Sequence, residues 1–108
     1  MSNPLARRRV ACLQDVPDGE CIAVELEDRE IALYRVDSQV FATDNICTHG
    51  AARLCDGFLD GYAIECPMHQ GAFDIRSGTV LREPAEDPLA TYAVEVDEQG
   101  EIYIELPA

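Results

Sequence analysis

The chain has 108 residues, of which 47% are hydrophobic and 27% are charged, a composition typical of one folded domain and not of a disordered chain. Asp and Glu number 21 against 8 Lys and Arg, so the formal net charge is −13. This charge argues against nucleic acid or an anionic membrane surface as a partner, because both are themselves negatively charged. The charge is explained by solubility alone, or by docking to a basic patch on a partner protein, where attraction over distance raises the association rate.

No run of residues approaches the ~18 apolar residues that a membrane-spanning helix needs. Three arginines at 7–9 resemble the start of a twin-arginine export signal, but no long apolar stretch follows them. We expect these arginines to form a charged edge at the start of the fold. The sequence therefore predicts a cytoplasmic protein with no membrane partner, in which the five cysteines stay reduced unless they bind metal.

Short segments rich in Val, Ile, Tyr and Phe alternate with turn signals along the chain. They predict a meander of three strands and a terminal hairpin, at residues 21–26, 31–36, 40–43, 91–96 and 101–106. The last segment alternates strictly, with Ile102, Ile104 and Leu106 on one face. Two prolines in 82–92 predict an ordered loop there. No window has a helical stripe, so we expect an all-β fold, a small antiparallel β sandwich or barrel.

The middle segment, about 45–80, has less β character and more Gly, Cys and His, and is expected to be a small excursion inserted between strands. It holds both histidines of the chain, each close to a cysteine: Cys47 and His49, then Cys66 and His69, with sixteen residues between His49 and Cys66. Thiolates and imidazoles together bind iron, copper or zinc. Zinc takes Cys₂His₂ sites, but its familiar spacing keeps like ligands together. Mixed pairs suit a two-iron cluster held between two loops.

The motifs "CTHG" and "CPMHQGAFD" resemble the two cluster loops of the Rieske iron–sulfur family. The similarity spans nearly the whole chain and implies a single Rieske domain over 1–108, with a cluster-binding subdomain at about 45–80 inserted in a basal β domain. It also implies one Rieske-type [2Fe–2S] cluster per chain. Cys47 and Cys66 would bind the inner iron, and His49 and His69 the outer iron near the solvent.

Four positions differ from the respiratory and photosynthetic members of that family. Where those members have two further cysteines that form a disulfide, this chain has Ala52 and Met68. Where they have a serine and a tyrosine whose hydroxyls donate hydrogen bonds to sulfur, it has Gly71 and Phe73. Because such hydrogen bonds raise the potential, we expect a reduction potential at the low end of the family, on the order of −150 mV.

A low potential without a membrane anchor resembles the soluble ferredoxins of bacterial aromatic-ring hydroxylating dioxygenase systems. The resemblance implies a monomeric electron carrier, not an enzyme. Its partners would be a flavin-containing ferredoxin reductase that oxidises NADH or NADPH and a terminal Rieske non-haem iron oxygenase. Two alternatives stay open: a Rieske-type small subunit of another oxidoreductase, such as a nitrite-reductase-like complex, and a Cys₂His₂ zinc-stabilised interaction module.

The remaining cysteines and prolines have simpler expected roles. Cys12 and Cys21 alternate with apolar neighbours and are predicted to be small core residues. Cys55 breaks the symmetry of the two loops, so we expect a free thiol. Pro84 and Pro88 are expected to shape a loop that shields the cluster from water.

Overall fold

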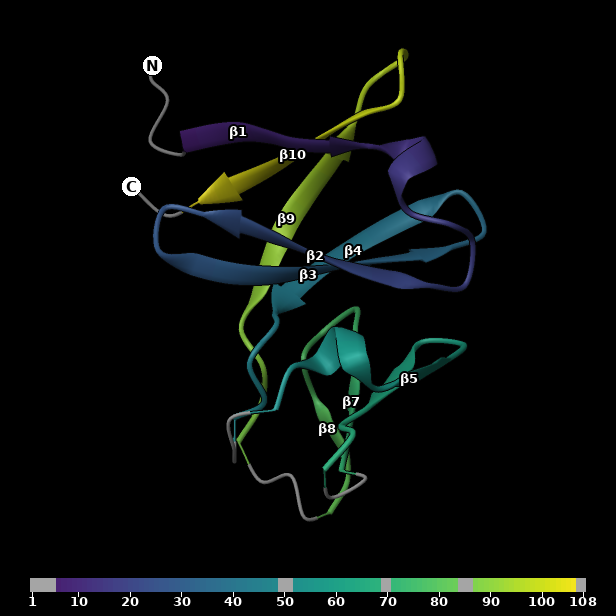
Figure 1. Ribbon diagram of the computed structural model, residues 1–108, viewed down its shortest axis with the longest axis vertical. Helices are drawn as coiled ribbons and strands as arrows, with labels where there is room; N and C mark the ends of the chain where they lie inside the picture. Colours follow the sequence, from purple (N-terminus) through teal and green to yellow (C-terminus); the bar gives the residue numbers. More distant parts are fainter. Residues whose placement is uncertain (1–5, 49–51, 69–70, 84–86, 107–108) are drawn as a thin grey trace.

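The structure is a computed structural model that describes residues 6–48, 52–68, 71–83 and 87–106 (Figure 1). Within these ranges the regular elements are strands and two single turns of 3₁₀ helix. They are β1 (Ala6–Cys12), η1 (Leu13–Asp15), β2 (Cys21–Leu26), β3 (Arg29–Val36), β4 (Gln39–Asp44), η2 (Leu54–Asp56), β5 (Phe58–Asp60), β6 (Ala63–Glu65), β7 (Ala72–Asp74), β8 (Val80–Arg82), β9 (Thr91–Val96) and β10 (Glu101–Leu106). None of the described residues belongs to a helix long and apolar enough to cross a membrane.

The strands form two antiparallel sheets at opposite ends of the molecule (Figure 1). The larger sheet has the order β1-β10-β9-β4-β3-β2, and its edge strands β1 and β2 contact each other, so the sheet is a nearly closed barrel. The smaller sheet has the order β5-β6-β7-β8, and all its strands lie between β4 and β9 in the chain. The prediction of an all-β fold with an antiparallel barrel is confirmed.

The strands predicted in the larger sheet are all present. Three of them, β2, β9 and β10, begin and end where the sequence predicts, whereas β3 and β4 are slightly longer than expected. The turn before β3 is tight: Leu26 pairs with Arg29, and the two residues between them, Glu27 and Asp28, have φ of 51° and 69°. A two-residue hairpin loop needs positive φ at such positions, which matches the right-handed twist of the strands.

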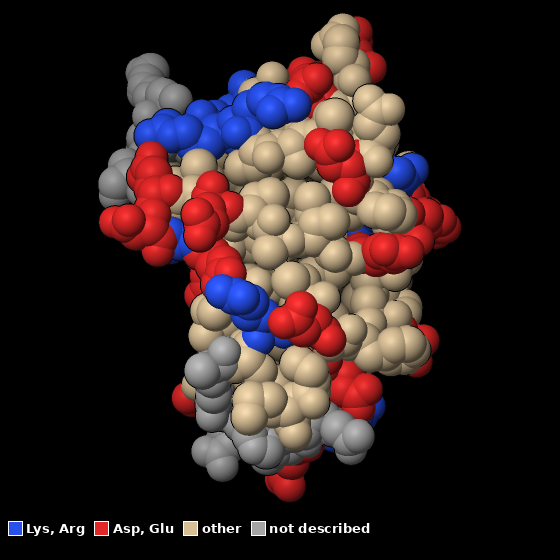
Figure 2. Space-filling view, viewed as in Figure 1, with Lys and Arg blue, Asp and Glu red and all other residues tan. Residues whose placement is uncertain are grey.

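The arginine-rich segment is a strand, β1, which the sequence indicated only as a charged edge. It lies at the edge of the larger sheet and pairs with β10. In Figure 2 its arginines form a blue stripe at the end of the molecule opposite the smaller sheet. Each of them has a carboxylate partner: Arg7–Glu95, Arg8–Glu27 and Arg9–Glu101. Exposed pairs of this kind contribute only ~0–1 kcal/mol each, so the stripe blunts a sheet edge more than it stabilises the barrel.

Strand β3 is buried on both of its faces. One face, with Ile31 and Leu33, packs into the barrel core together with Ile102 and Ile104 of β10. The other face, with Ala32 and Tyr34, packs into a second core under the smaller sheet. Its buried partners are Cys47, Ala52, Leu54, Ile64, Cys66, Phe73, Ile75 and Leu89. The barrel and the smaller sheet are therefore joined by one strand that belongs to both cores.

The smaller sheet places its apolar side chains on the face toward β3. Leu59, Ile64, Phe73 and Val80 are paired in register across its four strands, and all four contribute to the second core. These strands have three residues each, too few for a period-two pattern to be detected, so the sequence indicated a segment of lower β content but not this sheet. Between β7 and β8 the register shifts, which leaves Leu81 unpaired in a β-bulge.

Two glycines of this region predict different responses to the same substitution. A Cβ on Gly57 would collide with the carbonyl oxygen of Glu65, whereas Gly61 at φ +62° has open space around it. Gly57→Ala should therefore lower the free energy of unfolding by about 3 kcal/mol through overpacking. Gly61→Ala should cost about 1 kcal/mol, for the left-handed backbone alone.

Urea denaturation of both variants, followed by far-ultraviolet circular dichroism, measures the two values. Equal losses of stability in the two variants would contradict the close approach of Gly57 to β6.

Candidate metal centre

The first cysteine–histidine motif lies in a narrow hairpin between β4 and η2. Ile46 forms an isolated bridge with Arg53, and the Leu54 amide donates to the carbonyl oxygen of Asn45 at 2.7 Å. The hairpin closes where the Cys47 amide donates to the Ala52 carbonyl oxygen at 2.9 Å. Cys47 is therefore fixed at the base of a short loop.

Asn45 fastens this hairpin to the barrel and is fully buried. Its amide donates to the carbonyl oxygen of Glu30 in β3 at 2.9 Å, and its side-chain Oδ1 accepts from the Cys55 amide at 3.0 Å. The Arg53 side chain adds an ion pair with the Glu30 carboxylate at 2.9 Å. Among the described residues Asn45 Nδ2 has no hydrogen-bond partner. Three contacts thus hold the foot of the first motif against β3 and η2.

The second motif is the connection between β6 and β7. Glu65 pairs with Ala72 in the sheet, and the next residue, Cys66, donates its amide to the Gly71 carbonyl oxygen at 2.7 Å. The bond spans five residues, as does the bond from Cys47 to Ala52 in the first motif. The two motifs are therefore built alike, each with its cysteine at the base of a loop closed by one backbone hydrogen bond.

The two cysteines belong to the same core. Their exposed fractions are 3% for Cys47 and 1% for Cys66, neither is in a disulfide, and both side chains pack in the second core. Buried sulfur donors brought together on two loops are what a shared metal centre needs from its protein side. The donor chemistry fits a [2Fe–2S] cluster whose inner iron is held by thiolates.

His49 and His69 lie outside the described residues, as do Gly50, Gln70 and Pro84. Along the chain, each histidine falls within the loop that its cysteine closes. The described residues by themselves contain no group of three or more His, Cys, Asp or Glu side chains placed to hold a metal ion. Of the four expected ligands, the structure therefore describes Cys47 and Cys66, whereas His49 and His69 are expected from the sequence alone.

The surroundings of the two thiols agree with the departures found in the sequence. No disulfide links the loops, and none of the five cysteines, all within the described ranges, is in a disulfide. Ala52 is buried at the return leg of the first hairpin, and Met68 is 62% exposed at the second loop. Phe73 is fully buried in the core that also contains Cys47 and Cys66, and it has no hydroxyl to donate to sulfur.

The loop before β9 lies against the first motif. Thr48 Oγ1 donates to the carbonyl oxygen of Asp87 at 2.9 Å, and Leu89 is buried in the second core. Pro88 is exposed between them. Residues 83–90 connect β8 to β9, and residues 87–90 of this connection are anchored at the cluster loop; its role as a shield for the cluster stays a prediction.

Side chains also join the strands from which the first motif emerges. The Tyr92 hydroxyl of β9 donates to the carboxylate of Asp44 at the end of β4, and Arg29 Nη1 of β3 donates to the Tyr92 oxygen at 3.1 Å. Burial, together with the bond to Asp44, raises the pKa of Tyr92, so the tyrosine stays neutral and keeps donating. This network fixes the point at which the chain leaves the barrel.

Large exposed apolar side chains gather at this end of the molecule. Among the described residues they are Ile46, Phe58, Met68 and Leu81, and none of them lies in the larger sheet. Ile46 and Met68 flank the two cysteines in sequence, whereas Phe58 and Leu81 lie on the two edge strands of the smaller sheet. Sequence reasoning missed Phe58 and Leu81, because an apolar residue in a short strand gives no sign of which face is covered.

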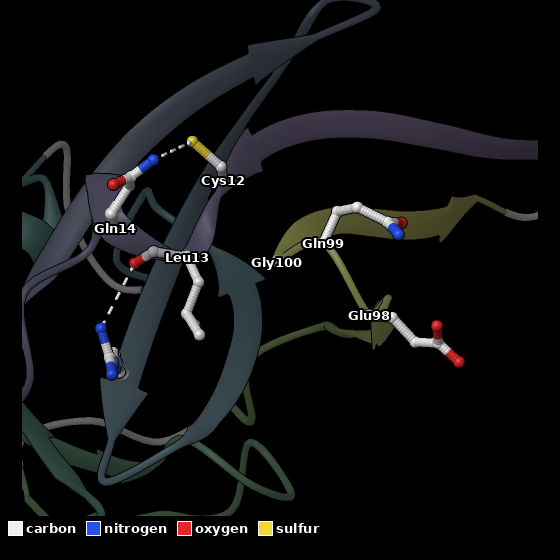
Figure 3. Close-up of a pocket in the computed structure, with 7 residues that line it drawn as sticks. Cys12, Leu13, Gln14, Glu98, Gln99 and Gly100 are labelled. Carbon is white, nitrogen blue, oxygen red and sulfur yellow. Dashed lines mark hydrogen bonds between the residues drawn. The ribbon is translucent and has the colours of Figure 1, made fainter.

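Cys12 lies far from this centre and is not the core residue that its apolar neighbours predicted. It precedes η1, where its amide and its thiol both donate to the Asp15 carboxylate, at 3.0 and 3.3 Å. Figure 3 shows its sulfur facing the Gln14 amide at the wall of a hollow of about 420 Å³. Cys12 contacts the Asp15 carboxylate and not apolar side chains, because Asp15 lies three residues later in the turn that Cys12 precedes. Cys21, by contrast, packs against the second core as expected.

Most of the chain is similar in sequence to known iron–sulfur proteins. Residues 7–93 match the Rieske [2Fe-2S] domain family. The ferredoxin component of the naphthalene 1,2-dioxygenase/salicylate 5-hydroxylase systems of a Ralstonia species is 51% identical over 87 residues, which cover 81% of this chain and 84% of the relative.

Two solved structures have the same fold. The Sphingomonas yanoikuyae B1 ferredoxin has a TM-score of 0.88 at 44% identity, over 94% of this chain and 100% of that one. A chain from the complex of reduced oxygenase and oxidized ferredoxin in carbazole 1,9a-dioxygenase has a TM-score of 0.85 at 40% identity, over 91% of each chain. The chain therefore belongs to the Rieske [2Fe–2S] domain family, and its cofactor is a Rieske-type [2Fe–2S] cluster.

Proposed function

We propose that this protein is a Rieske ferredoxin that carries single electrons from an NAD(P)H-dependent flavin reductase to a terminal aromatic-ring hydroxylating dioxygenase. The relative from Ralstonia is named as the ferredoxin component of such a system, and a similar chain is part of a complex with an oxygenase. The observation that carries the proposal is the pair of buried thiols at the end of the molecule where the exposed apolar side chains gather. A carrier needs that combination, a protected redox centre close to a surface that a partner can cover.

The ligands in this proposal are Cys47 and Cys66 for the inner iron, and His49 and His69 for the outer iron. When bound, the cluster supplies a one-electron redox centre. The chain contributes the two closed loops, which fix the sulfur donors, and the core around Phe73, which excludes water from them. The relatives are named as ferredoxin components, which supports a protein that delivers electrons and leaves the chemistry on the substrate to its partner.

The same surroundings favour a low reduction potential. Gly71 and Phe73 donate no side-chain hydrogen bond to sulfur, and 21 carboxylates in the chain disfavour an additional electron. A potential on the order of −150 mV is expected for a Rieske centre of this kind. A donor at that potential can be reduced by a flavin and can in turn reduce an oxygenase of similar potential.

Docking to two partners in turn requires small contacts that separate quickly. Ile46 and Met68 supply exposed apolar side chains next to the proposed cysteine ligands, and a net charge of −13 attracts a basic partner surface over distance. Such encounters lie at the low end of interface sizes and weaken as salt screens the charges. We therefore propose a monomer that binds the reductase and the oxygenase at the same end and binds neither nucleic acid nor membranes.

The proposed organisation is a single domain over residues 1–108, with a cluster-binding subdomain at about 45–80. The arrangement of the smaller sheet between β4 and β9 supports it. The proposed location is the cytoplasm, where thiols are kept reduced, and five cysteines outside any disulfide suit that compartment.

Replacing each proposed ligand tests the metal centre. Cys47→Ser, Cys66→Ser, His49→Ala and His69→Ala should each abolish the visible absorption and the rhombic paramagnetic signal, with an average g value below 2, that reduced wild-type protein gives. Cys12→Ser, at the opposite end of the molecule, should keep both. Metal and sulfide analysis of the wild type should give two irons and two sulfides per chain. One zinc and no sulfide would instead indicate the zinc module.

Replacing the natural carrier tests the function itself. A naphthalene 1,2-dioxygenase system that lacks its ferredoxin component should oxidise naphthalene again when this protein is added, because the reductase and oxygenase then exchange electrons through it. The rate should fall as salt is raised, since the encounter is charge-assisted. A protein that holds its cluster but never restores oxidation, and that copurifies with a reductase subunit, would support the small-subunit alternative.

The docking surface predicts a loss of electron transfer without a change at the metal. Met68→Glu replaces an exposed apolar side chain with a charge and should slow electron delivery to the oxygenase by about tenfold, equivalent to ~1.4 kcal/mol. Gln99→Glu adds the same charge at the far end of the barrel and should leave the rate unchanged. Stopped-flow oxidation of the reduced protein by the oxygenase gives both rates. Equal rates in the two variants would move the docking site away from Met68.

A further inference from the structure

Two cysteines that the metal centre does not use lie together beneath the first cluster loop. Cys21 is the first residue of β2, and Cys55 is the middle residue of η2. These two elements contact each other, and both cysteines line one hollow of about 230 Å³ at the junction of the barrel with the smaller sheet. Each thiol is partly buried, and each is free in this structure.

The polar surroundings of the two thiols leave them available to each other. The Cys21 sulfur has one long contact, 3.9 Å, with the carbonyl oxygen of Ile22. Burial raises the pKa of Cys21, and the neighbouring Cys55 thiol raises it further. Neither residue is therefore a lone cysteine, since the fold brings this pair together from distant parts of the chain.

Cys55 lies next to the contacts that anchor the first cluster-loop hairpin. Its amide donates to Oδ1 of Asn45, the residue that fastens the first cluster-loop hairpin to β3. Leu54, next to it, closes the same hairpin through the Asn45 carbonyl oxygen and is fully buried. A covalent bond at Cys55 would hold the foot of this hairpin to the first residue of β2.

We propose that Cys21 and Cys55 form a reversible disulfide that staples the first cluster loop to the barrel when the thiol pool becomes oxidising. The oxidant is a low-molecular-weight disulfide such as oxidised glutathione. The Cys55 thiolate attacks it, forms a mixed disulfide and releases one glutathione thiolate. The Cys21 thiolate then attacks the Cys55 sulfur and releases the second glutathione. The two cysteines lose two electrons and two protons, and one glutathione disulfide becomes two thiols.

The order of the two attacks follows from burial. Cys21 ionises with difficulty because it is desolvated, so it is a poor first nucleophile and acts once the neighbouring sulfur is activated. Gly19 lines the same hollow, and open space lies where its side chain would be, which leaves room for the glutathione to approach. Reduction by excess glutathione reverses both steps.

The wild-type holoprotein tests this proposal without any substitution. It is equilibrated without oxygen in mixtures of reduced and oxidised glutathione, quenched with acid, alkylated and mapped by mass spectrometry without reduction. A peptide pair linked through Cys21 and Cys55 should appear as the mixture becomes more oxidising, while the visible absorption of the cluster is retained. Alkylated thiols or separate glutathione adducts on both residues in the most oxidising mixture would overturn the proposal.

Thermal unfolding supplies a second measurement, with Cys12→Ala as the matched control. Oxidised wild type and Cys12→Ala should both unfold at a temperature on the order of 10 °C above their reduced forms, because the linkage restricts the unfolded chain. Cys21→Ala and Cys55→Ala should show no such rise. A rise of equal size in Cys21→Ala would place the stabilising linkage elsewhere and contradict the proposed pair.

Discussion

The structure depends on one strand that is buried on both faces. Alternation along β3 sends Ile31 and Leu33 into the barrel core, and Ala32 and Tyr34 into the core that holds the two buried thiols. The Tyr34 hydroxyl bonds to Thr43 Oγ1 at 2.8 Å, so the polar atom that this arrangement buries has a partner. Because β3 contributes to both cores, the two ends of the molecule cannot separate or rotate as independent bodies.

From that shared strand follows the precision of the metal centre. The first hairpin is anchored at Glu30, the second residue of β3, through both its carbonyl oxygen and its carboxylate. The second hairpin continues β6 and β7, whose inner face packs on the same core. Both proposed sulfur donors are thus held in place by β3 and the core around it. This favours electron transfer, because a metal centre that moves little between oxidation states has a small reorganisation energy. The apolar side chains at this end can then vary with the partner while the donors stay fixed.

Sequence reasoning predicted the parts of this molecule that have a strong local pattern. Strict alternation in β10 and the β-branched runs of β2 and β9 fixed those strands to the residue, and the spacing of Cys47, His49, Cys66 and His69 indicated the family. The three-residue strands of the smaller sheet were not predictable, because three residues are too few to show the period-two alternation of a strand. The environment of Cys12 was not predictable either, because it is set by the nearby carboxylate of Asp15. The closeness of Cys21 to Cys55 was not predictable because it depends on contacts between distant segments.

The insertion of the smaller sheet between β4 and β9 has a consequence for how the protein is made. These two strands are neighbours in the barrel, paired at Ala42–Tyr92 and Thr43–Thr91, and they join its two halves. The chain between them must fold back on itself before β9 can reach β4, and closing a loop of that length is entropically costly while the intervening chain is slack. A cluster held by the proposed ligands of both hairpins would link them and shorten the loop that has to be closed. Binding of the cofactor would then favour completion of the barrel, and a chain without iron would leave the pairing of β4 with β9 more open to proteolysis.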